Sequence, residues 1–375
     1  MGNDVILWVD SAAKLQQVCK EARAASVVAV DSEADSFHSY YPKVCLVQLS
    51  FSGRHAVVDT LKLSPQELAP LGELLADGQT LKVLHGADYD LRMLQKDFAF
   101  RLRNLADTQA AAQVLGEPQT SLAALVKKEL GFELDKSQQR ADWALRPLSS
   151  EMLRYAVDDT RYLEALLTRL KARLEALGRL EWWEEECQAL EQVAYQPPDP
   201  DPWAFLRIKG ARALSAEALG RLKVLWEWRE SVAQALDVAP FRVLPSDLLL
   251  RLALNPPSDF SELVQTPGMP PRVARRWGAA ILQVLAQVSE VTLPPASLRT
   301  RPDEARERLV KKLRAVRDQV AQVLALDPGF LAPRASLEAV ADRRPENDQA
   351  WLECLKRRWR VAVLKEPLGK VLAET

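Results

Sequence analysis

Short apolar runs alternate with stretches of helical periodicity through the first half of the chain. Runs rich in β-branched residues predict buried strands at 26–31, 44–50, 55–59 and 80–84. Apolar positions at helical spacing predict helices over 64–75, 89–97, 107–115 and 121–130, and a longer helix from 149 to beyond 174. Ser64 and Pro65 give the first helix an N-cap and a proline at its first position. This alternation predicts an α/β domain, a mixed sheet with flanking helices.

The second half of the chain shows helical periodicity throughout. Helices are predicted at 216–236, 246–253, 259–265, 273–288, 302–326, 336–341 and 348–363. The pairs Arg229-Glu230 and Arg317-Asp318 each precede a Leu-Asp pair, at 236–237 and 326–327. This similarity predicts a diverged repeat of one small helical unit, so we expect all-α helical domains after the α/β domain.

Two proline-rich stretches divide the chain, at 196–203 and near 293–303. Proline fixes φ and removes a hydrogen-bond donor, so such stretches end helices and form stiff connectors. They predict three domains, at 1–195, 203–290 and 301–375.

The composition is that of a globular protein, with 48 % apolar and 27 % charged residues. No apolar run approaches the ~20 residues of a membrane span, and the N-terminal residues lack the basic region of a signal peptide. We therefore expect a cytoplasmic protein without a membrane partner. The four cysteines are scattered without a CxxC pair, which predicts reduced thiols rather than a zinc site or disulfides.

Charge is distributed unevenly between the two halves. Residues 1–200 hold 22 Lys and Arg against 30 Asp and Glu, whereas residues 201–375 hold 28 against 21. An acidic half that needs cations, joined to a basic half that could meet phosphate, is typical of a nuclease. Unevenly solvated faces would also give this distribution.

Acidic residues lie where two of the predicted strands end. Asp31 and Glu33 close a buried strand, and side chains two apart in an extended chain point the same way. Two like charges are costly to bury unless cations neutralise them, although a solvated strand end would explain this pair alone. Asp88 and Asp90 follow another strand, with Asp88 placed to cap the next helix and Asp90 in its first turn.

A third acidic group lies on the long predicted helix. Tyr155 and Asp159 are four residues apart and share one helix face. Asp158 is rotated by roughly 100° from Asp159 and cannot share that face.

The order of these groups, DxE, then a turn aspartate, then YxxxD on a helix, resembles the DEDD exonuclease superfamily, tyrosine subtype. The stretches 104–109 and 136–149 resemble the ribonuclease D family within it, with Ala141 where that family prefers serine before Asp-Trp. The resemblance covers roughly residues 5–190. It implies a 3′→5′ exonuclease domain with a ribonuclease H-like mixed sheet.

The resemblance also implies a metal centre. Asp31, Glu33, Asp90 and Asp159 are its expected ligands for two divalent ions, Mg²⁺ or Mn²⁺, that bracket the terminal phosphodiester. Asp31 is expected to bridge the ions, and Tyr155 to orient the attacking water. Carboxylates suit these hard cations, and the lack of Cys/His clusters argues against zinc.

Three further residues are candidates for binding the substrate. Lys136 and Arg146 could contact its phosphates, with surface salt bridges as the alternative for both. His85 is the third candidate, although packing at the end of its strand explains it more simply. Trp143 is expected in the core.

The basic half has its own resemblance. Trp203, residues 207–210, 228–230 and 242–244, and Pro267-Gly268 resemble an HRDC domain, the helical module shared by RecQ-type helicases and ribonuclease D. Residues 301–375 resemble a degenerate second copy. The resemblance implies phosphate contacts that fix position without reading sequence, while rigid spacers or protein-contact modules remain the alternative.

The combination predicts an exoribonuclease that trims single-stranded 3′ ends of tRNA precursors and other small structured RNAs, releasing nucleoside 5′-monophosphates. The same chemistry could act on DNA, so a 3′→5′ DNA exonuclease of repair, with single-stranded DNA as its partner, is an alternative. The sequence contains no GxxxxGK[ST] phosphate loop, which weakens the DNA alternative. A non-catalytic nucleic-acid adaptor is disfavoured because all four acids and Tyr155 are present.

Overall fold

The strands of the first half form one sheet in a computed structural model that describes residues 6–197, 199, 201–287 and 304–374. Within these residues its six strands lie in the order β1-β4-β3-β2-β5-β6. Their bounds are Ile6–Val9, Val27–Ala34, Val44–Phe51, Arg54–Asp59, Leu81–Leu84 and Leu105–Asp107 for β1 to β6. The pairs β2–β3 and β3–β4 are antiparallel, and β1–β4, β2–β5 and β5–β6 are parallel. The sheet is therefore mixed, as predicted.

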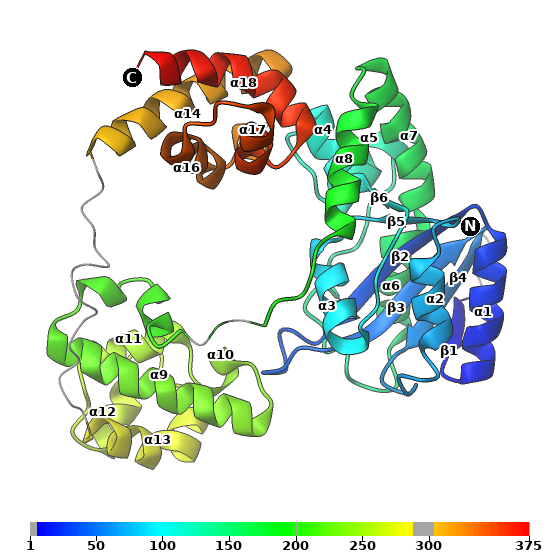
Figure 1. The fold of residues 1–375 in the computed structure, drawn as a ribbon. Coiled ribbons are helices and arrows are strands. Elements are labelled where there is room, and N and C mark those ends of the chain that lie inside the picture. Colours follow the sequence, from blue (N-terminus) through cyan, green and yellow to red (C-terminus); the bar gives the residue numbers. More distant parts are fainter. Residues whose placement is uncertain (1–5, 198, 200, 288–303, 375) are drawn as a thin grey trace. The chain divides into compact units, whose positions relative to one another are not determined.

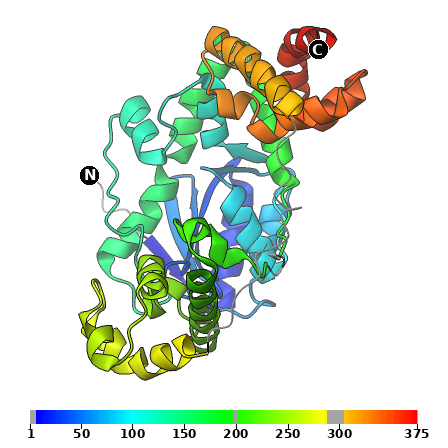
Figure 2. The ribbon, with the colours of Figure 1, turned by 90° about the vertical axis from the view of Figure 1, so that its left-hand side faces the viewer.

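Helices cover both faces of this sheet (Figures 1 and 2). On one face pack α1, α2 and α3, at Ala12–Ala24, Ala69–Ala76 and Asp88–Phe98. The other helices are α4 (Thr108–Leu115), α5 (Leu122–Leu130), α6 (Ser150–Arg161), α7 (Leu163–Ala176) and α8 (Leu180–Glu191). Side chains along β2 point alternately to the two faces of the sheet. Val28 and Val30 pack in the core with α1–α3, and Ala29 packs in the core with α4–α7.

Several predicted elements have different bounds in the structure. The helix predicted over 64–75 begins only at Ala69, after a turn in which Ser64 and Glu67 bond each other. Pro70 is the reason, because it has no N–H to bond the carbonyl of Gln66 and forces the helix to restart. The strand β1, the helix α1 and the short strand β6 were not predicted.

Each of two long predicted helices is divided into two helices in the structure. The helix from 149 to beyond 174 is interrupted at Tyr162, whose ring stacks on Phe132 at 5.0 Å. The helix over 348–363 is divided by Lys356, which adopts a positive φ of 67° between α17 (Asp348–Leu355) and α18 (Arg358–Ala373). Neither interruption lies at a proline or glycine, so packing rather than local propensity decides both.

The chain divides into two compact units. The first contains residues 1–34, 44–195 and 301–375, and the second contains 35–43 and 196–300. The break at 196 coincides with the first proline-rich stretch, whereas the second, near 293–303, lies outside the described residues. The C-terminal helices therefore share a unit with the sheet.

These C-terminal helices are α14 (Glu304–Leu324), α15 (Pro328–Leu331), α16 (Arg334–Arg343), α17 and α18. They have a core of their own and also pack on α8. Trp359 of α18 stacks on Trp182 of α8, with ring centroids 4.9 Å apart. At Gly116, which ends α4 with a φ of 77°, an added Cβ would lie 1.8 Å from the carbonyl oxygen of Ala325. The two parts of this unit are thus in close contact.

The second unit consists of the short 3₁₀ helices η1 (Ala204–Arg207) and η2 (Ala211–Ala213), followed by α-helices. The α-helices are α9 (Ala216–Leu236), α10 (Pro240–Val243), α11 (Ser246–Leu254), α12 (Phe260–Gln265) and α13 (Pro271–Leu285). Residues 35–43, which connect β2 to β3, belong to this unit. Asp237 accepts hydrogen bonds from the backbone of Tyr40 and Tyr41, and Arg242 donates to the carbonyl of Phe37.

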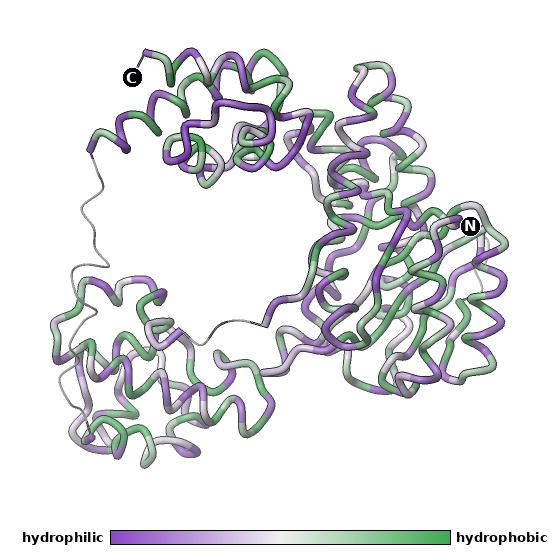
Figure 3. Tube along the Cα trace, viewed as in Figure 1, coloured by the Kyte–Doolittle hydropathy of each residue, from purple (hydrophilic) through white to green (hydrophobic). Residues whose placement is uncertain are grey.

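The two helical regions repeat one internal skeleton. In each, a 21-residue helix (α9 or α14) carries a buried arginine at the same position in its second half, Arg229 or Arg317. Arg229 donates to the carbonyl of Leu244, and Arg317 donates to the carbonyl of Ala332, 88 positions later in both cases. Hydrophilic and hydrophobic residues alternate along these helices, as amphipathic packing requires (Figure 3).

The remaining global expectations concern cysteines and membranes. All four cysteines are free and buried. Of the helices that the structure describes, none is long and apolar enough to cross a membrane.

Candidate active site

The strand β2 places two carboxylates on one face of the sheet. Its first residues are buried and β-branched, and it continues through Asp31 and Glu33 before the chain leaves the sheet. Because side chains alternate along a strand, Asp31 and Glu33 face the layer that contains α6, while Ser32 faces the layer that contains α3.

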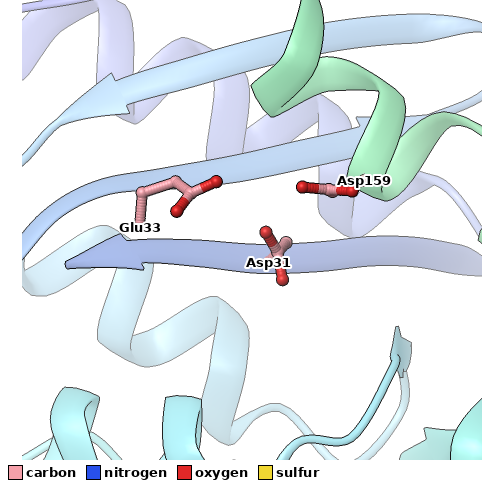
Figure 4. A group of neighbouring side chains, drawn as sticks. All are labelled: Asp31, Glu33 and Asp159. Carbon is pink, nitrogen blue, oxygen red and sulfur yellow. The ribbon is translucent and has the colours of Figure 1, made fainter. Parts of the chain in front are cut away.

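The helix α6 brings the third carboxylate to the same point. It packs on β2, β3 and β4, and its N-terminus is capped by Ser149, whose hydroxyl accepts from the amide of Met152. Asp159 points from this helix towards Asp31 and Glu33 (Figure 4). One carboxylate oxygen from each of the three lies within 4.8 Å of the others. The DxE pair and the YxxxD aspartate thus converge, although more than 120 residues separate them in sequence.

The fourth predicted ligand, Asp90, reaches the site from α3. It is 8 % exposed and accepts a hydrogen bond from the hydroxyl of Ser32. Asp88, two residues earlier, is exposed and held by Arg92 through two hydrogen bonds. Of the two turn aspartates, Asp90 is therefore the buried one, and its charge acts on Asp31 and Glu33. It is not among the three carboxylates whose oxygens lie within 4.8 Å of one another, so its role as a ligand stays a prediction.

Burial and mutual repulsion oppose the ionised form of these acids. Burial, and then the charge of Asp90, raises the pKa of Asp31 well above its usual range, and burial followed by Asp159 does the same to the pKa of Glu33. Burial raises the pKa of Asp90 to about 6 and that of Asp159 to about 7. No ion pair among the described residues reaches any of the four. Without a cation from the described residues, these acids hold protons more tightly than free carboxyl groups do.

Tyr155 lies one helical turn before Asp159 and donates a hydrogen bond to it. Its ring packs on Trp143, with centroids 5.8 Å apart. Burial, followed by the charges of Asp159 and Glu33, raises the pKa of the Tyr155 hydroxyl. The phenol therefore keeps its proton at neutral pH and acts as a hydrogen-bond donor. Trp143 is 1 % exposed, which confirms its predicted place in the core.

The other predicted substrate-binding residues have different surroundings. Lys136 is exposed in the segment between α5 and α6. All five N–H groups of Arg146 are occupied, by the Asp59 carboxylate and by the carbonyls of Cys45, Trp143 and Leu145. Arg146 thus holds its own segment against the sheet, and this geometry does not support the predicted phosphate contact.

His85 is partly buried at the end of β5. Its Nδ1 lies 2.9 Å from the hydroxyl of Thr108. Burial lowers the pKa of its imidazole, although Asp107 opposes this shift, so the ring is neutral at pH 7. It is not a member of the carboxylate cluster.

The sequence analysis missed two polar residues at this site, Ser32 and Gln48. Ser32 stands between the two predicted ligands of β2 and bonds Asp90. Gln48 lies opposite Asp31 on β3. A polar residue within an apolar strand, as in VCLVQLS, is the sequence signal that could have revealed Gln48.

The donor set fits hard divalent cations. It consists of three carboxylates from two elements, β2 and α6, and such oxygen donors suit Mg²⁺ and Mn²⁺ better than zinc. Since no basic side chain of the described residues pairs with these carboxylates, bound divalent cations could neutralise them.

Comparisons with known proteins agree with this geometry. A family model for 3′-5′ exonucleases matches residues 6–175, and a model for the HRDC domain matches residues 218–285. Ribonuclease D of Granulibacter bethesdensis is 34 % identical over 338 residues, which cover 87 % of this chain and 84 % of that protein. Ribonuclease D of Desulfotalea psychrophila is 30 % identical, with 87 % and 88 % covered.

Two solved structures share the architecture. The catalytic core of RRP6 from Trypanosoma brucei is 30 % identical, with a TM-score of 0.68 and coverage of 76 % of this chain and 79 % of that one. Escherichia coli RNase D, an exoribonuclease involved in structured RNA processing, is 26 % identical, with a TM-score of 0.67 and coverage of 100 % and 99 %. The chain therefore belongs to the ribonuclease D family of 3′→5′ exoribonucleases.

Proposed function

We propose that this exoribonuclease cleaves the terminal phosphodiester at RNA 3′ ends with two divalent ions held by Asp31, Glu33, Asp90 and Asp159, releasing nucleoside 5′-monophosphates. The observation that carries the proposal is the convergence of three carboxylates within 4.8 Å, beside Asp90, without a cation from the described chain. Four acidic side chains at one point are costly without such ions.

Each residue has a distinct role in this proposal. Bound Mg²⁺ or Mn²⁺ would activate the attacking water and stabilise the leaving 3′ oxygen. Asp31, at the centre of the carboxylates, would bridge the ions, and Asp90 would be fixed by the Ser32 hydroxyl. Tyr155, which keeps its proton, would hold the attacking water by a hydrogen bond and would not serve as a base.

Precursors of tRNA and other small structured RNAs are the proposed substrates. The support is the family itself, together with the description of the Escherichia coli relative as an enzyme of structured RNA processing. Lys136, which is exposed, is retained as a phosphate contact, and neutral His85 as a hydrogen-bonding group for the substrate. The preference for RNA over DNA also remains a prediction.

The helical regions are proposed to engage the body of the RNA. We retain the domains predicted at 203–290 and 301–375, the second as a degenerate HRDC-like copy, because the buried arginine and its carbonyl acceptor recur 88 positions apart. Within the first copy, Arg242, Arg272, Arg276 and Trp277 line a cavity of about 480 Å³. Such a basic, aromatic surface suits phosphate contacts, so binding should weaken steeply with salt.

The test compares a 3′-tailed tRNA with a DNA strand of matching sequence, in Mg²⁺ and in Mn²⁺. Asp31→Asn should abolish trimming and spare RNA binding. Asp88→Asn is the matched control, since Asp88 is exposed and paired with Arg92, and it should trim normally. Faster trimming of DNA would overturn the substrate assignment, and unchanged trimming by Asp31→Asn would overturn the metal assignment.

A further inference from the structure

Gln48 of β3 is the most poorly satisfied side chain near the site. It is 0 % exposed, and neither its Nε2 nor its Oε1 has a hydrogen-bond partner among the described residues. A buried amide without partners is costly, and native structures seldom leave both of its polar atoms in that state. The amide therefore calls for a partner that the folded chain alone does not supply.

The strand register places this amide beside the metal ligands. Gln48 is the cross-strand partner of Asp31 in the antiparallel β2–β3 pair. Residues directly opposite each other on such strands point to the same face, with Cβ atoms ~4.5–5.5 Å apart. The amide thus stands next to the central carboxylate, on the face that α6 covers.

The two neighbours of Gln48 on this face of β3, Leu46 and Ser50, have packing or hydrogen-bond partners. Leu46 packs in an apolar cluster with Ala156 of α6. The hydroxyl of Ser50 bonds His55 and Thr160, at 2.8 and 2.6 Å. Of these three side chains of β3, only Gln48 has polar atoms without a partner.

We propose that Gln48 is a positioning residue for the metal site. Its Nε2 donates a hydrogen bond to the Asp31 carboxylate when ions are bound, and its Oε1 accepts one from a water on a bound ion. This inference rests on the proposed two-ion function. It adds a residue that orients a metal ligand and does not itself bind an ion.

The chemistry of an amide suits this task. Carboxylates that bind metals are commonly held in turn by hydrogen bonds from residues behind them. A lysine or arginine beside Asp31 would neutralise the charge that attracts the ions. A glutamine orients the carboxylate and leaves its charge available.

Gln48→Met tests the proposal, because methionine has a similar volume and lacks the polar atoms. In EDTA, its melting temperature should equal or exceed that of the wild type, since an unsatisfied buried amide is removed. Mn²⁺ affinity, measured by calorimetry, should fall by ~10–100-fold, the usual loss for residues behind metal ligands. The Mn²⁺ concentration for half-maximal trimming should rise correspondingly.

Ser50→Ala is the matched control. It lies on the same strand and face, two residues away, and its hydrogen bonds go to His55 and Thr160 rather than to a carboxylate of the site. It should lower the melting temperature in EDTA because it leaves Thr160 and His55 without that bond, and it should keep wild-type Mn²⁺ affinity. Gln48→Met should therefore lower only the Mn²⁺ affinity, and Ser50→Ala should lower only the melting temperature.

The possible failures are distinguishable. If the wild type binds Mn²⁺ and Gln48→Met binds it equally well, the role of Gln48 is refuted and the two-ion function stands. If the wild type itself binds no Mn²⁺, both fail. Should Gln48→Met not fold, a wild-type crystal structure with Mn²⁺ decides. A hydrogen bond from Nε2 to Asp31 supports the proposal, and an amide still without partners contradicts it.

Discussion

Two acidic groups in the same compact unit, one buried and one partly buried, have opposite charge surroundings. Glu186 of α8 is 6 % exposed and accepts hydrogen bonds from Arg357, Arg360 and the indole of Trp359. Asp90 is also buried, and Asp31, Glu33 and Asp159 are partly buried, yet no cation of the described residues pairs with them. Among the described residues, arginines therefore neutralise Glu186, whereas no basic side chain neutralises the four acids proposed to hold the ions.

This difference also separates the consequences of substitution. The arginines that surround Glu186 come from the C-terminal helices, so their interaction joins two parts of one unit. Removing an acid from the site should relieve repulsion, whereas removing an arginine partner of Glu186 should leave a buried carboxylate with one counter-charge fewer.

Asp159→Asn should have the largest effect on activity. It removes a carboxylate from the cluster, so trimming should fall beyond the ~10–100-fold typical of residues behind the ligands. In EDTA the same variant should melt at a higher temperature, because one buried charge is gone. Trimming rates and thermal melts check both signs. If the variant trims normally, Asp159 is not needed for activity. If it melts at a lower temperature than the wild type in EDTA, the acids of the site do not destabilise the fold by repulsion.

Arg360→Met should have the largest effect on stability. Removing one partner of a buried ion pair typically costs ~3–5 kcal/mol, and the loss here should lie towards the lower end because Arg357 still pairs with Glu186. The free energy of unfolding, from urea denaturation, should fall by about this amount. Mn²⁺ affinity of the folded protein should not change. A loss below ~1 kcal/mol would show that Glu186 is solvated in solution.

The pH dependence of stability should differ with and without metal. The pKa values of about 6 for Asp90 and about 7 for Asp159 lie above the ordinary 3.8, so the folded protein binds protons more tightly than the unfolded chain. In EDTA, their contribution to stability is fully present below pH ~4 and is lost as pH rises to about 7. Stabilisation by Mn²⁺ should grow over the same range. Melting curves that run parallel in EDTA and Mn²⁺ from pH 5 to 8 would contradict this.

Asp88→Asn should have the smallest effect. Asp88 and Arg92 form an exposed pair, which is worth ~0–1 kcal/mol. Melting temperature and trimming rate should both stay near the wild-type values. A large loss of activity would move the ligand assignment from Asp90 to Asp88.

The sequence predicted much of this arrangement because its signals are local or ordered along the chain. The alternation of strands and helices indicated the mixed sheet, and the DxE and YxxxD motifs indicated the three carboxylates that converge. Asp90 could be chosen over Asp88 only through the family resemblance, since both lie in one turn. The structure adds the physical difference, because Asp88 is exposed and Asp90 is buried against Ser32.

What the sequence could not predict depends on contacts between distant residues. For Arg146 the sequence left a phosphate contact and a salt bridge both open, because its carboxylate partner, Asp59, lies 87 positions away. The partners of Glu186 lie more than 170 positions away. The helix interruption at Tyr162 could not be predicted because no proline or glycine lies there. The position of Gln48 opposite Asp31 follows only from the strand register.

The most direct test is anomalous diffraction at the manganese edge from crystals grown with Mn²⁺. The account predicts two anomalous peaks in contact with Asp31, one or both also bound by Glu33, Asp90 and Asp159. Crystals with no peak among these carboxylates, or with ions bound elsewhere while the cluster stays empty, would contradict it.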